Sequence, residues 1–304
     1  MIKKHTYKNL TWVDLFRPTQ EEIRELMKDY SLIPSIAEDL LTPTFKPSVD
    51  LHKDFLYLIL HFPALKHTHF NEKDQEVDFI VGRDFIITSR YDTIDSLHKF
   101  SKEFDVTSIL EKENVDGNAE HIFFLILKKL YNSVNYELES IQDSLETAEN
   151  MIFKGEERRM VRELSGISRD LLNFKQATNT HKETLESLSS VGSKFFDNDF
   201  GEHMKEIVTL HDKIRHHIAM NRESLVELRD TNDSLLSTKQ NETMTVLTIM
   251  AFVTFPLSLI ASIFGMNTET MPLVGQTNDF WMVIGIMLVL TTCMFLLFKY
   301  KKWL

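Results

Sequence analysis

The residues best placed to do chemistry in this chain follow a long uncharged run near its end. Residues 244–264 contain no charged side chain, and Gly265, Met266 and Asn267 come directly after them. The last carbonyl groups of a helix have no partner within the helix, and they carry the negative end of its dipole. Asn267 adds a neutral amide oxygen there, so several converging copies would form a mouth that favours cations.

A ring of neutral oxygens suits a divalent cation that stays hydrated. Mg²⁺ gives up its water reluctantly and keeps several waters when it is bound. Neutral groups can hold the hydrated ion through hydrogen bonds, whereas a ring of carboxylates risks holding it too tightly for release. Gly265, Met266 and Asn267 are therefore a candidate selectivity filter, with Asn267 as the residue that meets the metal.

Two apolar runs must position this tripeptide. Residues 244–264 and 280–298 are each long enough to cross a bilayer core of about 30 Å, which needs roughly 20 helical residues. The loop of residues 265–279 contains Glu269 and Asp279 but no Lys or Arg, whereas three Lys follow the second run. The positive-inside rule then predicts a multi-pass protein of the plasma (inner) membrane with an external loop and both termini in the cytoplasm.

If the first span is a helix, most residues on one of its faces have small or polar side chains. Two helices cannot enclose an aqueous path, so a pore requires several copies of the chain. Small and hydroxyl residues also allow close helix packing in lipid, so the face fits a pore lining and a packing seam equally well. The second span lacks such a face and is expected to contact lipid. The candidate pore-lining residues are Asn241, Met244, Thr248, Ala251, Phe255, Ser258 and Ser262.

The charge of the chain is distributed unevenly. The net charge is -11, and residues from 241 onward contain as many Lys as acids, so the excess negative charge lies in residues 1–240. This acidic part favours cations as partners and argues against binding nucleic acid or an anionic lipid surface. No phosphate-binding loop or nucleophile elbow occurs among the nine glycines. We therefore expect no enzyme, no ATP-driven pump and no organic cofactor.

The remaining sequence predicts an α+β fold with predominantly helical content. Strand patterns occur near residues 10–15, 55–62, 77–81 and 85–89, and Thr19 is the expected N-cap of an intervening helix. Apolar residues spaced by threes and fours then predict long helices. These are expected over residues 118–153, 156–191 and 200–264. The expected division is an α/β cytoplasmic domain (1–116), a stalk of long coiled-coil helices (117–240) and a transmembrane hairpin (241–304).

Several short segments of the chain match the pattern of one family. They are Phe264 to Asn267, Met271-Pro272, residues 241–248, Lys301 to Leu304, Trp12 to Asp14, Lys46-Pro47 and residues 79–88. With these segments the chain resembles the CorA family of divalent-cation transport proteins. The most specific match is the tripeptide at the end of the first of two C-terminal spans, and the resemblance covers essentially the whole chain.

The resemblance implies a funnel-shaped homopentamer in which five first spans line the pore and Asn267 holds hydrated Mg²⁺. It adds Leu247 to the pore-lining positions and places Met244, Leu247 and Phe255 in a hydrophobic constriction. It also implies closure when intracellular Mg²⁺ occupies acidic sites between neighbouring cytoplasmic domains, so Mg²⁺ is both the transported and the regulatory ion. The candidate regulatory residues are Glu202, Glu206, Asp212 and Asp230.

Two positions near the filter depart from the family pattern. Thr268 stands where an aromatic residue is common, and Leu273 stands where an acid is common. The preferred ion among Mg²⁺, Co²⁺, Ni²⁺ and Zn²⁺ therefore stays open. Besides a passive Mg²⁺ channel, the sequence allows a zinc transporter of the same superfamily, with or without proton coupling. A third alternative is a non-conducting, membrane-anchored coiled-coil sensor.

Overall fold

The structure is a computed structural model that describes residues 2–44, 46–64, 74–110, 118–196, 199–266 and 278–301. Its contacts divide the chain into two compact units, Met1–Arg229 and Asp230–Leu304. The fold is α+β with predominantly helical content, as predicted, and the three-part division at residues 116 and 240 stays a prediction.

The first unit contains a six-stranded sheet in the order β1-β2-β6-β5-β4-β3. Every neighbouring pair is antiparallel except β2 and β6, which are parallel with Val13 opposite Ile87. The four predicted strands are confirmed. The edge strands β1 and β3 were missed because they are short or largely polar, as edge strands often are. The strands are β1 (Ile2–Tyr7), β2 (Leu10–Phe16), β3 (Ser48–Leu51), β4 (Leu56–Pro63), β5 (Asp74–Val81) and β6 (Phe85–Arg90).

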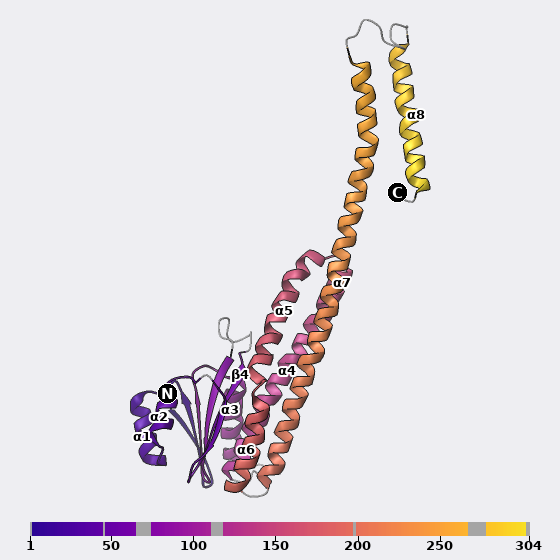
Figure 1. The fold of residues 1–304 in the computed structure, drawn as a ribbon. Coiled ribbons are helices and arrows are strands. Elements are labelled where there is room, and N and C mark those ends of the chain that lie inside the picture. The colour runs from indigo at the N-terminus through magenta and orange to yellow at the C-terminus, as the bar shows by residue number, and fades with distance from the viewer. Residues whose placement is uncertain are drawn as a thin grey trace. The chain divides into compact units, whose positions relative to one another are not determined.

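One face of the sheet is covered by the short helices α1 (Gln20–Tyr30) and α2 (Pro34–Asp39), as Figure 1 shows. The helix α1 begins at a capping box. The Glu22 amide donates to Thr19 Oγ1 over 3.3 Å, and the Thr19 amide donates to Glu22 Oε2 over 2.9 Å. The predicted N-cap is thus confirmed. From α1, Ile23 and Leu26 pack into the core formed with this face of the sheet.

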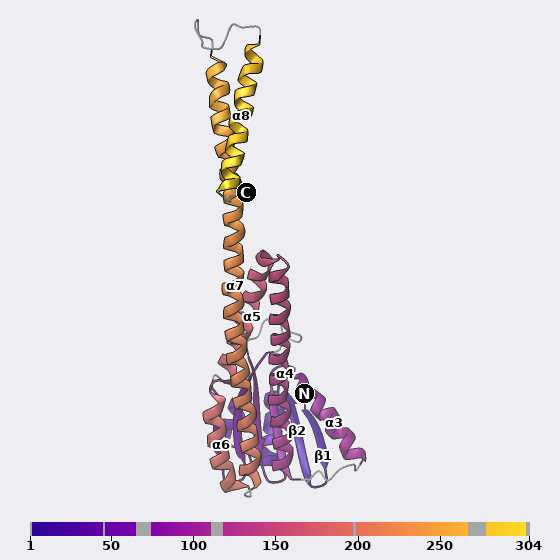
Figure 2. The ribbon, with the colours of Figure 1, turned by 90° about the vertical axis from the view of Figure 1, so that its right-hand side faces the viewer.

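The long helices of the first unit lie on the other side of the sheet (Figures 1 and 2). These helices are α3 (Asp95–Leu110), α4 (Ala119–Phe153), α5 (Glu157–Thr178), α6 (His181–Phe195) and the first part of α7 (Asp199–Phe264). The helix α4 confirms the helix predicted over residues 118–153.

The single helix predicted over residues 156–191 is wrong. The chain forms two helices, α5 and α6, that are separated at Asn179 and Thr180. Both residues are weak helix formers, and the break allows the imidazole of His181 to reach the sheet, where Nε2 lies 2.8 Å from the His61 carbonyl oxygen. Gly192 does not stop α6. A Cβ there would meet the Phe200 ring at 2.1 Å, so this glycine provides room for packing.

The second unit contains the end of α7 and the helix α8 (Asp279–Tyr300). Both helices are long and apolar enough to cross a membrane, as predicted. The helix α7 is continuous from Asp199 to Phe264 and contains Pro256. Proline removes one backbone hydrogen bond, which transmembrane helices tolerate where neighbouring groups compensate. Both views place α8 beside the C-terminal part of α7 (Figures 1 and 2).

Candidate functional site

The candidate filter begins where α7 ends. The Gly265 amide donates to the Ala261 carbonyl over 2.9 Å, and the Met266 amide donates to the Ile263 carbonyl over 3.2 Å. A Cβ on Gly265 would lie only 3.0 Å from the Ala261 oxygen, so glycine fits this tight end of the helix best. Asn267 and Glu269 lie outside the described residues. Their roles at the filter and in the external loop stay predictions.

The candidate pore-lining face of α7 is uncovered within the chain. Met244, Leu247 and Phe255 are 65%, 56% and 73% exposed. The other predicted lining residues are exposed as well, except that Ala251 is half-buried. They are Asn241, Thr248, Ser258 and Ser262.

The opposite, aliphatic face of α7 is more covered. Ile249 is only 7% exposed, and Val253, Leu257 and Ile260 are half-buried, although Val246 is 52% exposed. Both views place α8 beside this part of α7 (Figures 1 and 2). Within the single chain, the small and polar face is thus exposed to water or to other copies of the chain at every predicted lining position except Ala251.

The described end of the loop between α7 and α8 contains an acid that hydrogen-bonds to the backbone. Asp279 is the first residue of α8, and its Oδ1 accepts a hydrogen bond of 2.7 Å from the Phe280 amide. A carboxylate at this position interacts favourably with the positive end of the helix dipole. Asp279 thus has a structural role at the start of α8 in addition to the predicted role in the loop.

The candidate regulatory acids lie apart on the surface of α7. Glu206 pairs with Lys128 Nζ at 2.6 Å, Glu202 pairs with Lys205 at 3.0 Å, and Asp212 lies 3.6 Å from Arg215. Asp230 is also exposed. Within the described part of the chain, no three His, Cys, Asp or Glu side chains come together to bind a metal ion. A site built from these acids would therefore need groups from another copy of the chain or from water.

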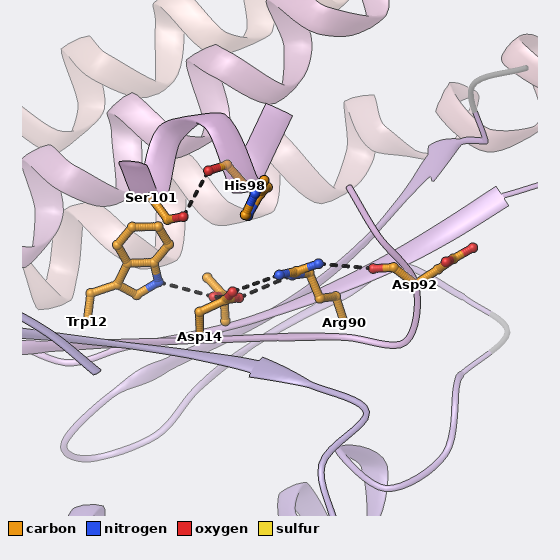
Figure 3. A network of polar contacts seen from close by, with 7 residues as sticks. Trp12, Asp14, Arg90, Asp92, His98 and Ser101 are labelled. Atoms are coloured by element: carbon orange, nitrogen blue, oxygen red, sulfur yellow. Dashed lines mark hydrogen bonds and ion pairs between the residues drawn. The ribbon is translucent and has the colours of Figure 1, made fainter. Parts of the chain in front are cut away.

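Sequence reasoning missed a buried ion pair in the sheet (Figure 3). Arg90 Nη2 lies 2.9 Å from Asp14 Oδ2, and Asp14 Oδ1 accepts a hydrogen bond of 2.9 Å from Thr88 Oγ1. The same threonine accepts a bond of 3.1 Å from the Trp12 indole nitrogen. The parallel pairing of β2 and β6 places Asp14 opposite Thr88. An acid within the apolar run of residues 10–16 was the only local signal of this network.

A second buried network joins the sheet to the long helices. His181 Nε2 donates to the His61 carbonyl oxygen, so Nδ1 must accept, and Tyr131 donates its hydroxyl proton to Nδ1 over 2.8 Å. Burial lowers the pKa of His181 to about 3, with a smaller contribution from His211. His211 Nε2 donates to the Thr178 carbonyl over 3.0 Å, and burial lowers its pKa too. Both imidazoles are therefore neutral at physiological pH.

The whole chain, rather than the tripeptide alone, decides the family. Residues 7–301 match the family model described as CorA-like Mg2+ transporter protein. The chain belongs to this family. CorA-family proteins are transporters, so the expectation that the chain is not an enzyme is confirmed.

Individual CorA relatives are similar along nearly their whole length. The cobalt/magnesium transport protein CorA of Thermotoga maritima is 23% identical over 302 residues, which cover 97% of this chain and 83% of that protein. The cobalt/magnesium transport protein CorA of Methanocaldococcus jannaschii is 22% identical over 298 residues, which cover 97% of this chain and 92% of that protein.

Solved structures share the fold. The complete structure of the CorA magnesium transporter from Methanocaldococcus jannaschii matches with a TM-score of 0.83 at 20% identity, covering 99% of this chain and 94% of that chain. The full-length CmaX protein matches with a TM-score of 0.71 at 16% identity, covering 97% of this chain and 89% of that chain. These matches confirm the predicted architecture of an N-terminal sheet domain, long helices and C-terminal apolar helices.

Proposed function

We propose that this CorA-family transporter is a passive Mg²⁺ channel whose pore is formed by the α7 helices of five copies. One observation carries the proposal: the small and polar residues of α7 that lead to Gly265 and Met266 are exposed within the chain, whereas Ile249 on the aliphatic face is buried. A face with only lipid around it would not need the polar residues Asn241, Thr248 and Ser258.

In this proposal the filter holds the ion with its water. Five Asn267 amide oxygens at the external mouth accept hydrogen bonds from the hydration shell of Mg²⁺, which the ion loses reluctantly. Met244, Leu247 and Phe255 form an apolar constriction that closes by excluding water. The membrane potential supplies about 4.6 kcal/mol per 100 mV for a divalent ion that enters the cytoplasm.

Gating in this proposal depends on acids between neighbouring copies. Intracellular Mg²⁺ would bind near Glu202, Glu206, Asp212 or Asp230 and would hold the cytoplasmic domains together. At Glu206 the cation must compete with the Lys128 ammonium, which lies 2.6 Å from the carboxylate. Exposed ion pairs contribute little free energy, about 0–1 kcal/mol, so this competition costs little.

The filter is tested by Mg²⁺ flux into liposomes that contain the purified protein. We expect Asn267→Ala to reduce the flux to the level of empty liposomes while the oligomer keeps its mass by light scattering. The exposed cytoplasmic residue Asn132 provides a matched control, since Asn132→Ala should leave the flux unchanged. Full flux through an assembled Asn267→Ala protein would contradict the filter assignment.

The same liposomes separate the alternative functions. A channel of this kind carries Mg²⁺ and Co²⁺ or Ni²⁺ down their gradients without a pH gradient. A proton-coupled zinc transporter would instead show Zn²⁺ flux that depends on the pH gradient. A non-conducting sensor would show no flux of any of these ions.

The regulatory acids are tested by proteolysis of the full-length protein. Millimolar Mg²⁺ should protect the wild-type cytoplasmic part from protease, and Glu206→Gln should weaken this protection. Glu186→Gln is the matched control because Glu186 is also exposed and lies 3.9 Å from a lysine, Lys182. Equal protection of Glu206→Gln and wild type would remove Glu206 from the regulatory site.

A further inference from the structure

The α4–α5 tip, residues 153–162, carries a large apolar side chain that the fold leaves uncovered. Phe153 is the last residue of α4 and is 67% exposed, whereas Ile152 beside it is 1% exposed and Met160 on α5 is 3% exposed. The apolar contact at this end of the helix pair is thus made by buried neighbours. Phe153 adds little to it, so packing within the chain does not explain an aromatic ring at this position.

Hydrogen bonds fix the backbone that carries this ring. The helix α4 ends in a Schellman motif, in which the Gly155 amide donates to the Ile152 carbonyl over 3.0 Å and the Glu156 amide donates to the Met151 carbonyl over 3.1 Å. Gly155 has a φ of 93°, a left-handed conformation that glycine adopts without steric cost. The exposed ring is therefore held by an ordered turn at the end of a helix of 35 residues.

Two arginines of the tip have no partner of their own. Arg158 and Arg162 are exposed and lie four residues apart, so they share one face of α5. In the part of the chain that the structure describes, neither guanidinium group forms an ion pair or a hydrogen bond, whereas Arg159 lies 3.9 Å from Glu156. The tip thus combines an uncovered aromatic ring with two available guanidinium groups.

Acids around the tip balance its basic charge. Glu149, Glu156 and Glu163 are exposed and Glu157 is buried, against Lys154 and the three arginines. An attraction that depends on net charge alone is therefore weak. A guanidinium group, however, holds a phosphate through two parallel hydrogen bonds, which depends on local geometry. The partner that fits the tip is a phosphate group beside an apolar layer.

The helix α4 carries the tip along α7 within the first unit. Glu120 Oε1 lies 3.4 Å from His203 Nδ1, and Asn221 Nδ2 donates to the Leu138 carbonyl over 2.9 Å. Both pairs are 83 residues apart, so α4 and α7 run parallel in a constant register, and both views show them side by side (Figures 1 and 2). With this register, α4 accompanies α7 to the end of the first unit.

The length of the chain keeps a bilayer within reach of the tip. The apolar run of α7 begins at Met244, 15 residues after Arg229, which ends the first unit. This connection spans about 22 Å as a helix, and the limit does not depend on the angle between the units. The surface of a phospholipid bilayer presents phosphates next to an apolar layer, which are the two groups that the tip fits.

We propose that the α4–α5 tip docks on the surface of the bilayer that contains α7 and α8, with Phe153 in the interfacial layer and Arg158 and Arg162 on lipid phosphates. Membrane-surface segments commonly combine an apolar aromatic residue with basic residues in this way. Because the charge around the tip is balanced, docking occurs on zwitterionic phospholipids and does not require anionic ones. The contact is separate from the filter and from the candidate regulatory acids.

Quenching by labelled lipids tests the proposal with the full-length protein in phosphatidylcholine liposomes. Cys293→Ser removes the single cysteine, and Lys154→Cys then carries a bimane fluorophore next to Phe153. Asn132→Cys is the matched control, since residue 132 is also exposed on α4 and lies about 33 Å from residue 154 along the helix. Phosphatidylcholine with a nitroxide on its headgroup should cause about a twofold loss of fluorescence at position 154 and no loss at position 132, because only a docked label enters the headgroup layer.

Substitutions in the tip should remove this difference between the two labels. Phe153→Ser, and Arg158→Gln combined with Arg162→Gln, should each reduce the quenching at position 154 towards the level at position 132. Tyr136→Ser and Arg169→Gln are the matched controls, because both residues are exposed on α4 and α5 outside the tip, and neither substitution should change the quenching. All these side chains are exposed, so the variants keep the buried contacts of the fold.

Two results would overturn the proposal. The first is equal quenching at positions 154 and 132, or quenching at position 154 that neither tip variant changes. The second is a label at position 154 that is shielded from iodide in water but is not quenched by the nitroxide lipid, since a second copy or another protein would then cover the tip. The measurement involves no ion flux, so its outcome is independent of the proposed channel activity.

Discussion

The first unit of the molecule buries most of its large apolar side chains, whereas the second unit exposes most of its own. In residues 1–229 large side chains such as Trp12, Phe79 and Tyr131 are completely buried by the sheet and its helices. In the described part of residues 230–304, Ile249 and Phe298 are the only buried apolar residues, while Phe280 and Trp281 are 65% and 70% exposed. An exposed apolar surface of this extent is not stable in water and marks a contact with lipid or protein.

Polar groups show the same contrast. The first unit buries charged and neutral polar side chains in hydrogen-bonded networks, of which the Asp14–Arg90 pair is the clearest. The second unit exposes the polar side chains of its candidate pore face. The first unit thus completes its core within one chain, whereas the second acquires its surroundings only from the bilayer and from other copies.

Separating the two units should have the largest effect. A fragment of residues 1–229 should be soluble without detergent and should unfold cooperatively, because its core is formed within one chain. A fragment of residues 230–304 should aggregate unless detergent or lipid is present. Circular dichroism and sedimentation of both fragments provide the measurement. A soluble, monomeric C-terminal fragment in plain buffer would contradict the comparison.

Removing one partner of the buried ion pair should destabilise the first unit strongly. Asp14→Ala leaves the Arg90 guanidinium buried without its partner, and such changes cost about 3–5 kcal/mol. Chemical unfolding of the fragment 1–229 measures the decrease in the free energy of unfolding.

The exposed pair of Glu103 and Lys129, which is also 2.9 Å long, is the matched control. Glu103→Ala should cost less than about 1 kcal/mol because water solvates both groups in the absence of the pair. An equal decrease in the free energy of unfolding in the two variants would mean that burial does not decide how much an ion pair contributes to stability.

The buried histidine should give a smaller effect that depends on pH. The pKa of His181 is about 3 in the folded chain and near 6.5 in the unfolded chain, so the unfolded chain binds more protons between these values. The contribution of the neutral His181 imidazole to the free energy of unfolding is therefore complete above pH 6.5, and it falls as the pH is lowered towards 3. Between pH 7.5 and pH 5 the loss from this group should be about 1–2 kcal/mol.

The variant His181→Gln should show a weaker decrease in unfolding free energy over this pH range than the wild type. His216 is exposed on α7, and His216→Gln should keep the wild-type pH dependence. Urea unfolding at pH 7.5, 6 and 5 measures both variants. Parallel pH profiles for wild type and His181→Gln would show that this imidazole is not held neutral by burial.

The sequence alone determined the features that depend on neighbouring residues. The apolar length of residues 244–264 and 280–298 predicted both membrane helices, and apolar spacing predicted α4. The lack of Gly over residues 202–264 and of Pro over residues 200–255 predicted the uninterrupted α7. Thr19 predicted the start of α1 for the same reason, since an N-cap side chain bonds a backbone amide two or three residues later. Asn267 was recognised from its place after the first span, and its role stays a prediction.

Only the tertiary structure decided the features that depend on residues far apart in the chain. The break between α5 and α6 allows His181 to reach His61, 120 residues away. Asp14 meets Arg90 because β2 and β6 pair, although 76 residues separate them. Local periodicity sets which elements form, whereas burial and partners arise from contacts that no local pattern encodes.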